Sequence, residues 1–172
     1  MGLATFDSAI RQYLAPKASP QHLVDILAVL DKLAPASQTD ASHAFHDLAE
    51  RIRRRGLIVV LSDFLDNLEE LMLGMAHFRH KKHEVLAFHI LDPREIDFPF
   101  DDFMEFEDME TGQRMPVQAR LVQREAKRQA EAFIADLRQR CRQHAIEYVP
   151  VRTSDPVEWT LMSYLGKRSR MG

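Results

Sequence analysis

The sequence predicts an α/β protein in which a mostly parallel sheet is flanked by helices. Short apolar runs typical of buried strands recur along the chain. Segments with helical spacing of apolar residues separate these runs. The chain has 172 residues, of which 45% are hydrophobic and 28% charged, so it can bury a core. The length suits a single domain over residues 1–172.

The strands are expected where continuous apolar residues end at turn-forming ones. The run 57–61 lies between Gly56 and the Ser62-Asp63 pair, and its lack of alternation predicts a strand buried on both faces. Further strands are expected over 2–6, 85–91 and 146–151. Because helical segments lie between them, the order predicts strand–helix–strand units with right-handed crossovers and parallel strands.

The helices are expected where apolar residues recur every three or four positions. These segments are 21–33, 41–52, 68–80, 118–144 and 156–165. The first helix should bury the face formed by Leu23, Ile26, Leu27, Leu30 and Leu33. Asp66 or Asn67 should cap the third helix.

Residues 92–118 interrupt this order and are expected to form an acidic hairpin insertion. Two short segments, 103–106 and 114–117, flank a glycine-containing turn at 110–113. Residues 92–110 hold nine acids and one arginine, a net charge of −8, which leaves +5 for the rest of a chain whose total is −3. A solvated surface or a partner-steering surface would each account for this segregation. The tail 167–172 is basic.

Composition narrows the class of protein further. The near balance of charge argues against a protein that coats nucleic acid. No apolar run approaches the roughly 18 residues that span a bilayer, and the first residues do not have the pattern of a signal peptide. A single cysteine, Cys141, fits a reducing compartment and lies on a buried helical stripe, so an inert core thiol is expected. These features predict a cytoplasmic protein without a membrane span.

Three acidic residues are expected at strand ends: Asp7, Asp63 and Asp92. Open α/β sheets bind ligands at the carboxyl ends of their strands. Asp63, preceded by the hydroxyl of Ser62, could contribute to a Mg²⁺ site, because this cation prefers oxygen ligands. The alternative is that Asp63 or Asp66 caps the following helix. Thr39 likewise could be a helix cap or a hydroxyl ligand beside Asp63.

The histidines do not predict a zinc site. His77, His80 and His83 are three residues apart, so on a helix they spread around the axis and three ligands cannot converge. A solvated helix end is expected there. His43 and His46 are expected on the outward side of their helix.

The ordered blocks of the chain resemble the bacterial domain-of-unknown-function family fifty-eight. These proteins are von Willebrand factor A-like and are commonly encoded beside MoxR-type AAA+ ATPases. The resemblance covers essentially the whole chain, and its strongest element is the block 54–66, followed by Asp92-Pro93 and Glu110-Thr111-Gly112. The other blocks are 2–7, the Thr39-Asp40 loop, 83–93 and 148–150.

The resemblance implies a von Willebrand A-like doubly wound sheet with a metal-ion-dependent adhesion site. By motif matching, Thr39 corresponds to the threonine of the second loop and Asp63 to the aspartate of the third loop. The Asp-x-Ser-x-Ser motif of the first loop is absent from the chain. The chain is therefore expected to be the C-terminal part of such a domain, without its N-terminal central strand, and Thr39 and Asp63 to be a partial remnant that argues against a full Mg²⁺ site.

Two classes of function follow. The first is a non-enzymatic protein-interaction module that acts with a MoxR-type AAA+ ATPase in protein complex assembly or metal insertion, as the resemblance implies. The alternative is a metal-dependent hydrolase or phosphotransferase that uses Asp63, with Asp7 or Asp92 nearby. Without a central strand, the 57–61 strand would keep an unpaired edge, so a homodimer or domain swap is also expected.

Overall fold

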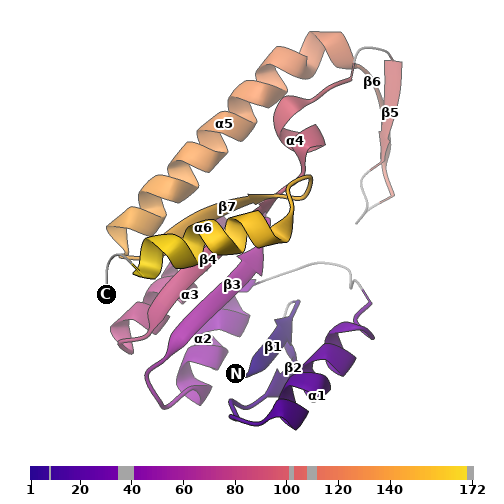
Figure 1. Cartoon of the computed structure of the whole chain (residues 1–172). Coiled ribbons are helices and arrows are strands. Elements are labelled where there is room, and N and C mark those ends of the chain that lie inside the picture. The colour runs from indigo at the N-terminus through magenta and orange to yellow at the C-terminus, as the bar shows by residue number, and fades with distance from the viewer. Residues whose placement is uncertain (8, 35–40, 101–102, 108–111, 170–172) are drawn as a thin grey trace. The chain divides into compact units, whose positions relative to one another are not determined.

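The computed structural model describes residues 1–7, 9–34, 41–100, 103–107 and 112–169 (Figure 1). The chain divides into two compact units. The first unit contains Met1–Arg55 and Leu65–Lys82, and the second contains Gly56–Phe64 and His83–Gly172. Each unit is therefore assembled from segments that are separated in the sequence.

The first unit begins with an antiparallel strand pair. Strand β1 (Leu3–Phe6) pairs with β2 (Ile10–Leu14). The buried carboxylate of Asp7 accepts a hydrogen bond from the backbone N–H of Ala9 at 3.1 Å and forms an ion pair with Arg11. The prediction that the first strand starts a parallel series is therefore wrong, because the Asp7 turn reverses the chain at once. The apolar pattern also failed to predict β2.

The helices described in the first unit are α1 (Pro20–Leu30), α2 (Ala41–Arg51) and α3 (Leu68–His80). Helix α3 has the predicted bounds, and its cap is Asn67, which accepts a hydrogen bond from the N–H of Glu70. Phe45 of α2 meets Phe6 of β1 with ring centroids 5.1 Å apart, and Phe78 of α3 at 6.0 Å. These aromatic contacts join β1, α2 and α3 in one core.

The predicted buried face of α1 is wrong. Among its five apolar residues, Ile26 is buried, whereas Leu23, Leu27, Leu30 and Leu33 are exposed. The helix begins where expected, because Ser19 accepts a hydrogen bond from the N–H of His22 and Pro20 occupies the first turn. Periodicity thus predicted the helix, although α1 ends at Leu30 and not at residue 33. It could not show whether another element covers the apolar face.

The second unit contains a parallel sheet with the strand order β3-β4-β7 among the described residues. Strand β3 spans Leu57–Ser62, β4 spans Glu84–Leu91 and β7 spans Glu147–Arg152. Helices α5 (Ala119–Gln143) and α6 (Val157–Ser169) belong to this unit. Phe88 meets Tyr164 of α6, and the next residue, His89, meets Phe133 of α5. Because successive strand residues point to opposite faces, the two helices cover opposite faces of the sheet (Figure 1).

These observations confirm the predicted α/β class, with helices flanking a parallel sheet. The prediction that the 57–61 strand is buried on both faces is wrong. Strand β3 pairs with β4 on one side, and the structure describes no second strand partner for it. Leu57, Val59 and Leu61 are 44%, 44% and 66% exposed, while Val60 between them is buried. One face of β3 is therefore open to solvent.

The insertion and the C-terminal segment complete the second unit. A short helix, α4 (Pro93–Asp97), precedes the predicted hairpin, which consists of β5 (Phe103–Glu107) and β6 (Arg114–Gln118) in antiparallel register. The predicted hairpin is confirmed, although most of its turn lies outside the described residues. The basic tail 167–172 begins within α6, where Arg168 donates a hydrogen bond to Glu84 at 2.5 Å and another to the hydroxyl of Tyr164 at 2.9 Å.

None of the helices among the described residues combines the length and the apolar character that crossing a bilayer requires.

The core of the second unit can be tested at Leu137, which is fully buried on α5. We expect Leu137→Ala to lower the free energy of unfolding by about 2–5 kcal/mol, because it leaves a cavity. Leu121→Ala is the matched control on the same helix, since Leu121 is 77% exposed, and it should change the free energy by less than about 0.5 kcal/mol. Urea unfolding followed by circular dichroism measures both. Equal losses would contradict this account of the core.

Candidate functional site

Asp63 follows β3 at the carboxyl edge of the parallel sheet, as predicted, and is exposed. The next residue, Phe64, is fully buried and has a φ of 58°, which a residue other than glycine rarely adopts. The Oγ of Ser62 accepts a hydrogen bond from the N–H of Phe64 at 3.0 Å. This tight turn anchors Phe64 in the core and leaves Asp63 at the surface.

The turn packs against His89, a buried residue within β4. The imidazole meets the rings of Phe64, Phe133 and Tyr148 edge-on, with centroids 5.6, 5.9 and 5.8 Å away. Its Nδ1 lies 2.8 Å from the Tyr148 hydroxyl. Burial lowers the pKa of His89, although a hydrogen bond to the Asp63 backbone and the charge of Asp63 oppose this shift. The ring is therefore neutral near pH 7.

His89 is the site residue that sequence reasoning missed. Its signal was a histidine inside an otherwise apolar strand, which requires hydrogen-bond partners once it is buried. The partners come from residues 26 positions before it and 59 positions after it. Local spacing could therefore not identify them.

The other acidic candidates have local roles. Asp92 follows β4, next to β3 in the sheet, and caps α4 by accepting a hydrogen bond from the N–H of Arg94 at 2.7 Å. Asp7 belongs to the turn in the first unit. Asp66 accepts a hydrogen bond from the N–H of Asn67, which itself caps α3, so neither Asp63 nor Asp66 is that cap. Thr39 lies outside the described residues.

Within the described part of the chain, no group of three or more His, Cys, Asp or Glu side chains is arranged to hold a metal ion. The sequence predicted that His77, His80 and His83 lie at a solvated helix end. The expectation that all three are solvated is wrong for His83, which is buried and whose Nδ1 accepts a hydrogen bond from the N–H of Gly56 at 3.2 Å.

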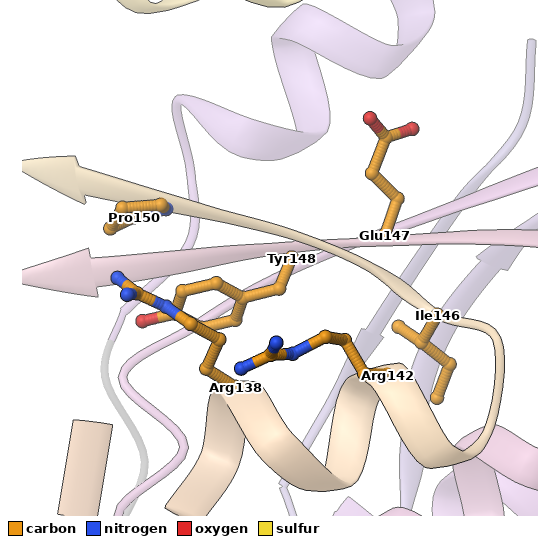
Figure 2. Close-up of a pocket in the computed structure, with 6 residues that line it drawn as sticks. All are labelled: Arg138, Arg142, Ile146, Glu147, Tyr148 and Pro150. Carbon is orange, nitrogen blue, oxygen red and sulfur yellow. The ribbon is translucent and has the colours of Figure 1, made fainter. Parts of the chain in front are cut away.

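Tyr148 also forms part of a shallow pocket of about 360 Å³ (Figure 2). Its walls come from the end of α5 and the start of β7, and it is lined by Arg138, Arg142, Ile146, Glu147, Tyr148 and Pro150. The guanidinium of Arg138 lies 5.5 Å from the centre of the Tyr148 ring, a cation–π contact. Burial raises the pKa of Tyr148 to about 12, so the phenol stays neutral beside the two arginines.

The pocket suits an anionic group of moderate size. Arg138 and Arg142 lie one turn apart on α5, and among the described residues neither forms an ion pair with a carboxylate. Guanidinium groups bind carboxylates through paired hydrogen bonds. The nearby thiol does not contribute, because Cys141 is fully buried and burial raises its pKa to about 11, as expected for an inert core thiol.

Fold and site together define an α/β protein whose parallel sheet presents an acidic turn at its carboxyl edge and an arginine-lined pocket beside β7. Residues 1–140 match the family described as "Protein of unknown function DUF58". The chain therefore belongs to this family, as the sequence blocks predicted.

Relatives of the chain include mycobacterial proteins, and the chain spans about half the length of one and about a third of another. The chain is 34% identical over 93 residues to the uncharacterized protein MAV169 of Mycobacterium avium, a match that covers 54% of this chain and 53% of MAV169. It is 29% identical over 115 residues to the uncharacterized protein Rv1480 of Mycobacterium tuberculosis, which covers 65% of this chain and 36% of Rv1480. No solved structure matches the chain.

The role of His89 predicts a pH dependence of stability. The pKa of His89 in the folded protein is lower than its ordinary value of 6.5, so the unfolded chain binds the proton more tightly. The contribution of His89 to the free energy of unfolding is therefore fully present above pH 6.5. It falls as the pH drops from 6.5 toward the pKa of His89 in the folded protein. We expect a loss of at most about 1.4 kcal/mol between pH 7.5 and 5.5.

Urea unfolding at both pH values measures this loss. His89→Gln should reduce the difference between the two pH values, since glutamine does not titrate. His80→Gln is the control, because His80 is exposed and should leave the difference unchanged. The role assigned to His89 is refuted if wild type and His89→Gln have the same pH dependence.

Proposed function

We propose that the chain is a non-enzymatic protein-interaction module. The observation that carries this proposal is the apolar row on β3, formed by Leu57, Val59 and Leu61. These alternate residues share one face of the strand, and in the parallel register they lie beside Glu84, Leu86 and Phe88 of β4. A contiguous apolar row on a strand with an open edge is a surface that a protein partner can cover.

The partner that we propose is a MoxR-type AAA+ ATPase, with a role in protein complex assembly or metal insertion. Support comes from membership of the family and from the resemblance of the sequence blocks, which implies that the gene lies beside one for such an ATPase. The pocket of Figure 2 would add specificity, because Arg138 and Arg142 can receive an acidic side chain of the partner.

The von Willebrand A-like assignment of the fold is part of the same proposal. Asp63, exposed two residues after Leu61, would then be the third-loop residue of an adhesion site, with Thr39 as the second-loop residue. The first-loop motif is absent from this sequence. We therefore propose that Asp63 contacts the partner through its carboxylate and that this chain does not form a complete Mg²⁺ site.

Binding to a purified MoxR-type ATPase from the same genome tests the proposal. We expect Leu61→Ser to weaken the complex at least tenfold, because it removes the most exposed apolar side chain of the row. Leu73→Ser is the matched control, since Leu73 is a similarly exposed leucine on α3 of the first unit. Biolayer interferometry measures both affinities. Absence of binding by the wild type, or equal weakening by the two variants, would refute the assignment of the partner surface.

The open edge of β3 also predicts self-association when no partner is present. Its backbone can pair with the same strand of a second copy. We expect light scattering after size exclusion to show a dimer or larger species, and Val59→Lys to shift the protein toward monomer, because an edge lysine opposes strand pairing. A monodisperse wild-type monomer with cooperative melting would contradict this expectation.

A further inference from the structure

Two histidines from neighbouring helices of the first unit face each other. The Nδ1 atoms of His46 on α2 and His77 on α3 lie 2.9 Å apart, and the ring centroids are 5.1 Å apart. The pair lies at the surface. Helices α2 and α3 share the packed core around Phe45 and Phe78, so regular helical backbone sets the spacing of the two rings.

A carboxylate contacts the second ring nitrogen of His77. The Nε2 of His77 lies 3.0 Å from a carboxylate oxygen of Glu50, whose other oxygen lies 2.8 Å from the Nζ of Lys81. The bond to Lys81 lowers the pKa of Glu50, so this group is ionised and accepts a hydrogen bond from the Nε2–H of His77. His77 therefore keeps its proton on Nε2 and directs the lone pair of Nδ1 toward His46.

We propose that His46 and His77 form a two-histidine binding site for a late first-row divalent cation, with Cu²⁺ preferred. Imidazole nitrogens lie about 2.0–2.1 Å from such cations. In a tetragonal site, two adjacent nitrogen ligands make an angle of about 90° at the cation. These two nitrogens are then about 2.9 Å apart. This is the observed separation of the Nδ1 atoms. A tetrahedral Zn²⁺ site would require a separation of about 3.3 Å. Nitrogen ligands also bind Cu²⁺ more tightly than Zn²⁺ in the Irving–Williams order, so Cu²⁺ is the preferred cation.

Binding requires both rings to turn, because a cation bound at about 90° lies beside the line between the two Nδ1 atoms and not on it. His46 moves its proton from Nδ1 to Nε2, and the cation then takes the place of the hydrogen bond between the rings. The contact of Glu50 with the other nitrogen of His77 is the arrangement that orients histidine ligands in metal proteins. Since the described residues supply no group of three such ligands, water completes the coordination shell.

Titration of the untagged chain with Cu²⁺ tests this site, with affinity measured by calorimetry and the ligands identified by electron paramagnetic resonance. We expect one Cu²⁺ per chain and splitting of the signal by two imidazole nitrogens. His46→Gln and His77→Gln should each weaken binding at least tenfold. Glu50→Gln should weaken it several-fold, because the tautomer of His77 is no longer held. Mg²⁺, which prefers oxygen ligands, should not compete.

Matched controls come from the same helices. His43 and His80 lie three residues from His46 and His77, respectively, and His43→Gln and His80→Gln should change the affinity less than twofold. Circular dichroism of each variant establishes that it is folded, and the nitrogen splitting of the wild type gives a result that does not depend on any variant. The proposal is overturned if Cu²⁺ binding survives unchanged in His46→Gln and His77→Gln, if it follows His43 or His80, or if the splitting shows fewer than two imidazoles.

Discussion

The second unit depends on the burial of its central strand, β4, in which residues 85–89 are all buried. The strand pairs on both sides, with β3 and with β7, and its side chains alternate between the two helix-covered faces. A polar side chain in such a strand must find hydrogen-bond partners, and His89 finds them in Tyr148 of β7 and the backbone of Asp63 after β3. One buried imidazole thereby links all three strands and holds the turn that exposes Asp63.

The outer edges of the sheet differ because their sequences differ. Strand β7 contains Pro150, which cannot donate a ladder hydrogen bond, and is bounded by the charged residues Glu147 and Arg152. These features discourage a further strand from pairing there. Strand β3 has no proline and no charge between Leu57 and Ser62, and it ends in an exposed apolar row. The chemistry of the two edges thus favours β3 as the one that a partner covers.

The parts of the fold that the sequence predicted were those set by local chemistry. Helix α3 has its predicted bounds because Asn67 caps it, and the hairpin formed where turn residues separate two short strands. Contacts between segments that are distant in the sequence could not be predicted from local patterns. The apolar run of β3 could not show that one face stays open, and the spacing of the leucines in α1 could not show that little covers them. The sequence predicted that the first strand belongs to the parallel series, whereas it pairs with β2 because the chain turns at Asp7.

Local sequence patterns also could not predict the candidate site that is formed by residues distant in the sequence. Asp63 was found because a carboxylate after an apolar strand is visible in the sequence, whereas the contact between His46 and His77 joins residues 31 positions apart on different helices. The two positions also differ in the ligand atoms that they offer. Asp63 offers carboxylate oxygens from a single residue, which do not make a complete Mg²⁺ site, while the paired imidazoles favour a late transition metal. The positions belong to different units. A substitution of Asp63 therefore tests the partner surface, and a substitution of His46 or His77 tests the cation site.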